Sequence, residues 1–121
     1  MLKDRAVIFM VKGVVEKGKK EANGLGFPTA NIPCETGAPS GIYAGEVIWK
    51  NATYPAALYK EDGKNVVEAH LLDFSGNLYG QELTFIARKK MREVKKFPEK
   101  KELAAAIAQD IKDIKALCSQ E

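Results

Sequence analysis

Residues 24–31 read Gly-Leu-Gly-Phe-Pro-Thr-Ala-Asn and combine groups that suit the binding of a phosphorylated ligand. Glycines let backbone N–H groups approach an oxyanion closely, and Pro28 fixes one backbone angle. Thr29 and Asn31 supply side-chain oxygens, the ligand type that a hard cation such as magnesium prefers. The same composition is common in turns without any ligand. The segment therefore predicts either a magnesium–phosphate site or a structural turn, in a backbone too irregular for plain helix or strand.

A second candidate lies in the clearest strand-like run of the chain. Side chains alternate along a strand, so Glu68 and His70 share one face, whereas Val67, Ala69 and Leu71 take the other. A buried carboxylate without a partner costs free energy, which favours a functional role or a specific pairing for Glu68. A solvent-facing Glu–His pair on an open sheet explains the pattern equally well. His70 by itself is expected to be a structural hydrogen-bonding residue.

Several other kinds of site are excluded. Residues 13–19 resemble the start of a P-loop, but Lys20 stands where Ser or Thr must bind magnesium. Gly24 and Gly26 lack the third glycine of a dinucleotide-binding fingerprint. No serine or cysteine has the sequence context of an activated nucleophile. A single histidine excludes a multi-histidine metal centre.

The composition predicts one globular domain over residues 1–121, with 45% hydrophobic and 29% charged residues. No apolar run approaches the roughly 20 residues of a membrane span. The apolar run at 6–11 is too short for a signal peptide. Cys34 and Cys118 form no CxxC pair and are expected to be reduced thiols of a cytoplasmic protein.

Basic residues are concentrated in one segment, although the net charge is only +3. They are Arg88, Lys89, Lys90, Arg92, Lys95, Lys96, Lys100 and Lys101. A nucleic-acid surface is one interpretation. Aromatic residues do not alternate with these charges, which favours a solvated face beside a pocket for an anionic ligand.

The order of strand and turn signals predicts a small antiparallel barrel. Strands are expected at 6–15, 41–49, 54–59, 65–74 and 83–87, with 16–39 rich in loop. The Asp-Gly pair within 60–64 predicts a hairpin turn.

The C-terminal region has helical periodicity instead. Leu103, Ile107, Ile111, Ile114 and Cys118 form one apolar stripe, which is expected to pack against the barrel. Pro98 suits the first helical position.

The order and spacing of several motifs resemble riboflavin kinase from about residue 11 to residue 117. The motifs are Gly-Val-Val at 13–15, Leu-Gly-Phe-Pro-Thr-Ala-Asn at 25–31, Gly-Ile-Tyr at 41–43, Val-Glu-Ala-His-Leu-Leu-Asp-Phe at 67–74, Leu-Tyr-Gly at 78–80 and Met-Arg-Glu-Val-Lys-Lys-Phe at 91–97. The resemblance implies a six-stranded antiparallel Greek-key-type closed barrel with a C-terminal helix. It also implies transfer of the ATP γ-phosphate to the ribityl 5′-hydroxyl of riboflavin, which gives FMN and ADP.

The resemblance assigns roles to individual positions. Glu68 corresponds to the base that acts on the ribityl hydroxyl, and Thr29 and Asn31 correspond to the ligands of magnesium and the nucleotide phosphates. Zinc and manganese are alternative metals. The remaining expected contacts are Gly18, Gly24 and Gly26 with the nucleotide, and Met91, Arg92 and Phe97 with the flavin. Riboflavin and ATP are the implied partners of a monomer that binds neither nucleic acid nor membrane.

The chain also departs from the family pattern. Ala22-Asn23 replaces a frequent Gly-Arg, and residues 54–59 run straight into the Asp-Gly turn where relatives usually carry a Gly-x-x-Pro segment. An impaired barrel that binds flavin or nucleotide without turnover is therefore an alternative, and a nucleic-acid-binding barrel is a third. No adenylyltransferase domain is recognised, so no FAD synthesis is expected.

Overall fold

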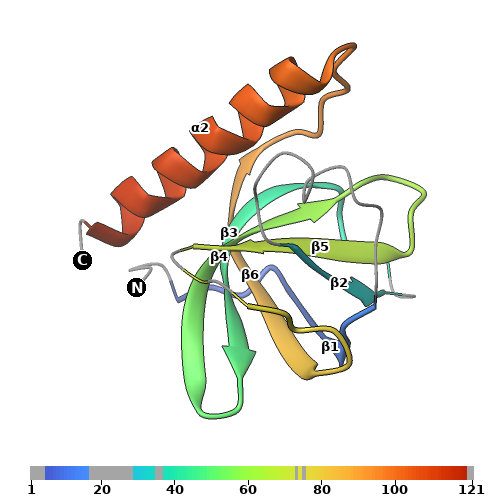
Figure 1. The fold of residues 1–121 in the computed structure, drawn as a ribbon, viewed down its shortest axis with the longest axis vertical. Helices are drawn as coiled ribbons and strands as arrows, with labels where there is room; N and C mark the ends of the chain where they lie inside the picture. Colours follow the sequence, from blue (N-terminus) through green and yellow to red (C-terminus); the bar gives the residue numbers. More distant parts are fainter. Residues whose placement is uncertain (1–4, 17–28, 35–36, 73, 75, 120–121) are drawn as a thin grey trace.

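The computed structural model describes residues 5–16, 29–34, 37–72, 74 and 76–119 (Figure 1). In these residues it contains six β-strands and one helix. The elements are β1 (Phe9–Val14), β2 (Thr29–Pro33), β3 (Gly41–Trp49), β4 (Ala52–Lys60), β5 (Val66–Leu71), β6 (Glu82–Arg92) and α2 (Lys100–Ser119).

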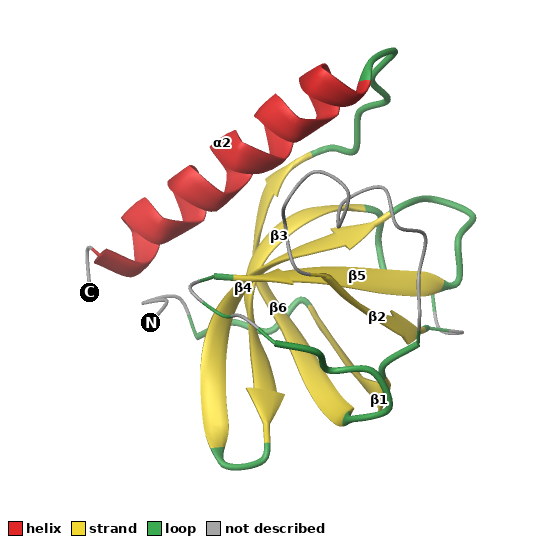
Figure 2. Cartoon of the chain, viewed as in Figure 1, coloured by secondary structure: helices red, strands yellow, loops and turns green. Residues whose placement is uncertain are grey.

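The strands form one sheet in the order β1-β6-β3-β4-β5-β2, and every neighbouring pair is antiparallel. Just after β1, the backbone N–H of Glu16 donates to the carbonyl of Asn31 in β2 over 2.8 Å. This bridge joins the two ends of the sheet, so the strands enclose a nearly complete barrel, while α2 lies across its outside (Figure 2). The mainly β barrel with a C-terminal helix is therefore confirmed.

The barrel interior holds the larger of two apolar clusters. Alternation along β5 points Val67, Ala69 and Leu71 inward, as the sequence predicts, where they join the buried rings of Tyr43 and Phe85. The β3–β6 pairing shifts register between Ala44 and Gly45. A side chain at Gly45 would collide with the carbonyl oxygen of Ile86, so this close approach of two strands requires glycine.

A second cluster fastens α2 to the outside of the barrel. Ala44 of β3 and Ala57 of β4 are paired opposite each other, and their small side chains let the helix approach. Ile114 is fully buried against them and against Leu72. The predicted stripe is confirmed, with Ile107 also buried.

Several boundary predictions are wrong. The strands expected at 6–15 and 65–74 are shorter, as β1 (Phe9–Val14) and β5 (Val66–Leu71). The stretch 16–39 contains β2, so Thr29 and Asn31 belong to a regular strand and not to an irregular turn. β4 extends to Ala52–Lys60 with Pro55 inside it, which is tolerated because pairing with β5 begins only at Ala56. β6 continues to Arg92, since its pairing with β3 reaches Ile42.

The helix begins later than its proline suggests. The carbonyl of Glu99 accepts from the N–H groups of Glu102 and Leu103, which makes Glu99 the cap residue and places Pro98 outside the first turn. Among the described residues, no helix combines the length and apolar character that crossing a membrane would require.

Candidate functional site

The pairing of β2 with β5 brings the predicted site residues together. Asn31 lies opposite Glu68, and Thr29 lies opposite His70. Residues directly opposite in an antiparallel pair point to the same face, with Cβ atoms about 5 Å apart. These four side chains therefore share the outer face of the barrel, where Asn31 is only 5% exposed.

Glu68 and His70 form a close pair on this face. Nε2 of His70 lies 2.7 Å from Oε1 of Glu68. The His70 side chain is 1% exposed, whereas that of Glu68 is 31% exposed. The interpretation of a solvent-facing pair on an open sheet is therefore wrong for His70, while Glu68 keeps access to a ligand.

Tyr59 covers His70 from the neighbouring strand. Its ring packs edge-on against the imidazole, with centroids 4.7 Å apart and planes at 74°. Tyr59 is also paired directly opposite Glu68 across β4 and β5. Asn31, Glu68 and Tyr59 thus form one cross-strand row over three neighbouring strands.

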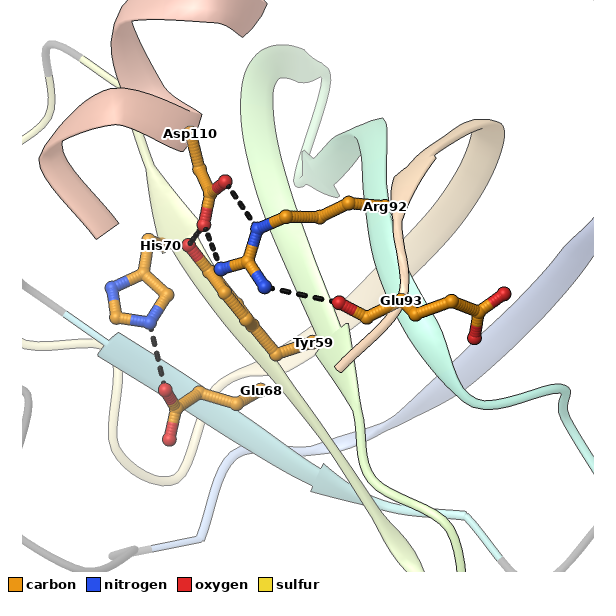
Figure 3. Close-up of polar contacts among 6 residues, drawn as sticks. All are labelled: Tyr59, Glu68, His70, Arg92, Glu93 and Asp110. Atoms are coloured by element: carbon orange, nitrogen blue, oxygen red, sulfur yellow. Dashed lines mark hydrogen bonds and ion pairs between the residues drawn. The ribbon is translucent and has the colours of Figure 1, made fainter. Parts of the chain in front are cut away.

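A carboxylate of α2 connects this row to the helix. Asp110 accepts a hydrogen bond from the Tyr59 hydroxyl over 3.0 Å. It also accepts from two nitrogens of the Arg92 guanidinium, Nε at 2.8 Å and Nη2 at 2.7 Å (Figure 3). Arg92 also donates to the carbonyl of Glu93 over 3.0 Å. We refer to Tyr59, Arg92 and Asp110 as the helix clamp. It joins β4, the end of β6 and the middle of α2.

The pKa values of two clamp residues, Tyr59 and Arg92, are raised by their surroundings. Burial raises the pKa of the Tyr59 phenol, and the nearby Asp110 carboxylate raises it further. The hydrogen bond to Asp110 raises the pKa of Arg92. The clamp therefore holds a neutral phenol beside a charged guanidinium.

The other predicted contacts divide into two groups. Gly18, Gly24 and Gly26 lie outside the described residues. Met91 packs on the outer cluster and Phe97 is half-buried in the connection between β6 and α2. Arg92 lies at the end of β6, but its guanidinium is engaged by Asp110.

Much of the basic segment is paired within the domain. Arg88 is buried and its Nε donates to Glu46 over 2.6 Å. Lys90 pairs with Glu93 over 2.6 Å. Arg88 therefore does not belong to a solvated face, whereas the lysines of the segment are exposed, as the solvated-face interpretation expects.

The residue patterns of the sequence did not indicate a site role for Asp110 or Tyr59. Asp110 lies three residues after Ile107 and four before Ile114, so it occupies the apolar stripe and is 5% exposed. A carboxylate at such an inward position requires a partner, and this signal was available in the sequence. Tyr59 has no comparable signal, because aromatic residues are ordinary in strands.

A metal at this site would depend on neutral oxygens and the ligand's own phosphates. In the described part of the chain, no three His, Cys, Asp or Glu side chains are grouped to hold a metal. The Thr29 hydroxyl and the Asn31 carboxamide oxygen fit a hard cation that keeps most of its ligands from phosphate and water.

A family model described as riboflavin kinase matches residues 6–118. The chain belongs to the riboflavin kinase family. Similar proteins include bifunctional riboflavin kinase/FMN adenylyltransferases from Mycoplasma pneumoniae, 38% identical over 84% of this chain, and from Pseudomonas fluorescens, 33% identical over 92%. This chain spans 39% of the length of each.

A solved structure has a fold similar to that of this chain. It is the crystal structure of a macrolide-efflux protein from Streptococcus pneumoniae, with a TM-score of 0.77. The similarity covers 88% of this chain and 38% of that one, at 22% identity. At this identity the similarity supports the barrel fold alone.

The helix clamp predicts a large loss of stability for Asp110→Ala. Removal of the carboxylate takes the hydrogen-bond acceptor away from the part-buried Tyr59 hydroxyl and Arg92 guanidinium, and we expect a cost of about 2 kcal/mol in urea unfolding. Asp113→Ala is the control, because Asp113 is exposed on the same helix and accepts a surface hydrogen bond from Gln109. It should cost about 0.5 kcal/mol or less. Equal losses for the two variants would contradict the clamp.

The raised pKa of Tyr59 predicts a loss of stability at alkaline pH. The folded chain holds the phenol proton above pH 10.0, where the unfolded chain releases it, so stability is complete below pH 10.0 and declines above it. At about pH 11 the parent should have lost roughly 1 kcal/mol more than Tyr59→Phe, each measured against its own value at neutral pH. Tyr43 also has a raised pKa but is present in both proteins. Identical declines would show that Tyr59 ionises normally.

Proposed function

We propose that this chain phosphorylates riboflavin at its ribityl 5′-hydroxyl, with ATP as donor and FMN and ADP as products. Membership of the riboflavin kinase family over residues 6–118 supports the reaction. The single observation that carries it is the row that places Asn31 opposite a partly exposed Glu68. A phosphate bound at Asn31 and a hydroxyl bound at Glu68 would therefore lie next to each other on one sheet.

Glu68 acts as the general base in this proposal. The ribityl 5′-oxygen attacks the γ-phosphorus, and the bond between that phosphorus and the ADP oxygen breaks. The hydroxyl proton passes to Oε2 of Glu68, since Oε1 is held by His70. Such reactions need positioning and charge stabilisation more than covalent catalysis.

Thr29 and Asn31 hold the phosphate end of the nucleotide. A bound magnesium ion would neutralise phosphate oxygens there. Asn31 is buried and lies in β2, between β5 and the Glu16 bridge, so its backbone is held on both sides. This support gives the γ-phosphate a fixed position relative to Glu68, as an in-line transfer requires.

The connection that follows β6 is the proposed neighbour of the flavin ring. Phe97 and Met91 are the candidate contacts. Because Asp110 binds the Arg92 guanidinium, we assign Arg92 to anchoring the start of this connection, with at most its aliphatic stem available to the ligand. The glycines at 18, 24 and 26 complete the proposed nucleotide site.

An impaired barrel that binds flavin or nucleotide without turnover is the second candidate. It is favoured by the departure at residues 54–59, which form a regular part of β4. Tight riboflavin binding without release of ADP would support it. A monomer in the cytoplasm, with magnesium preferred over zinc or manganese, completes the proposal.

Replacement of the base tests the assignment. Glu68→Gln keeps the size of the side chain and a polar atom for His70, but it cannot accept the hydroxyl proton. We expect FMN formation to fall about 100-fold or more, with an unchanged melting temperature. Glu61→Gln is the control, because Glu61 is exposed and its carboxylate pairs with Lys64 on the surface, away from Glu68 in the same chain. If Glu68→Gln made FMN as fast as Glu61→Gln, Glu68 would not be the base.

A further inference from the structure

His70 is a buried titratable side chain to which the proposed reaction gives no role, and it lies next to the proposed base. It lies on the same face of β5 as Glu68, but its side chain is 1% exposed, so it cannot contact a substrate directly. Its Nε2 holds Oε1 of Glu68 at 2.7 Å. This contact leaves Oε2, which has no hydrogen-bond partner among the described residues.

We propose that His70 is a positioning residue that orients Glu68 for proton transfer, an inference that rests on the proposed function. A glutamate that is 31% exposed has several accessible rotamers and loses conformational entropy when one is selected. The bond from a buried imidazole selects one of them before the substrate binds. It engages Oε1 and turns Oε2 outward to the ribityl hydroxyl.

The surroundings of His70 make it a rigid support. Its backbone is paired on both sides, with Thr29 of β2 and with Ala57 of β4. The Tyr59 ring packs against its imidazole at 4.7 Å. Tyr59 is in turn held by Asp110 over 3.0 Å, so the helix clamp supports the imidazole from the side of α2 (Figure 3).

A positioning role requires a hydrogen-bond donor at the place of Nε2, whereas a space-filling role requires only the volume of the side chain. The amide nitrogen of glutamine extends to about the place of Nε2, whereas that of asparagine extends only to about the place of Nδ1. His70→Gln therefore preserves a donor toward Glu68, and His70→Asn removes it at similar polarity. A residue that only fills space would not distinguish the variants in this way.

The test measures kcat and KM for riboflavin and ATP in the parent, His70→Gln and His70→Asn. We expect His70→Asn to lower kcat about 10-fold or more, with both KM values within about 2-fold of the parent. His70→Gln should recover kcat to within about 3-fold of the parent. In the Glu68→Gln background, His70→Asn should have no further effect, because His70 acts through that carboxylate.

Each outcome has a definite meaning. Equal kcat in the two variants, or a full additional loss in the Glu68→Gln background, would overturn the positioning role while leaving the kinase activity in place. A parent that makes no FMN would overturn the proposed function and the inference with it. If His70→Asn does not fold, Tyr59→Phe and Tyr59→Leu replace it. Phenylalanine keeps the ring against His70 and leucine does not, so equal kcat for these two would also overturn the proposal.

Discussion

The antiparallel register between β2 and β5 is the constraint on which the site depends. It places Asn31 opposite Glu68 and Thr29 opposite His70, so residues far apart in the sequence lie on one face. A shift of one residue would turn Thr29 and Asn31 into the core and bring Ala30 and Ile32 outside. Because Ala30 and Ile32 are fully buried in the barrel, their burial opposes such a shift. The hydrophobic core therefore fixes the geometry of the polar groups.

The outer face of the sheet is organised by the helix. Apolar contacts of Ile114 with Ala44, Ala57 and Leu72 place α2 against the barrel. Asp110 then reaches Tyr59 and Arg92 from the same helical stripe. Through the clamp, the Tyr59 ring that packs against His70 is linked to Arg92 and to the connection that follows it. We infer that the helix contributes to the orientation of Glu68 as well as to stability.

The sequence predicted the architecture of the chain better than it predicted the contacts between side chains. Alternation in β5 and the stripe of α2 identified the buried faces, because apolar periodicity reports burial directly. β2 was missed, since Pro28 and two glycines next to it resemble a loop while its pairing partner lies on a distant strand. Thr29, Asn31 and Glu68 were selected from motifs. That Asn31 lies directly opposite Glu68 follows from the register between β2 and β5, which a local sequence pattern does not contain. The same reason explains why the contact between Arg92 and Asp110 was not predicted.

The most direct test of the account is the conversion of riboflavin by the purified chain. The protein is incubated with riboflavin, ATP and magnesium, and the products are separated by chromatography, with a parallel sample that contains a metal chelator. A riboflavin kinase forms FMN and ADP in equal amounts with the metal, and no product with the chelator. Riboflavin that binds but remains unphosphorylated in the presence of magnesium and each nucleoside triphosphate in turn would contradict the proposed function.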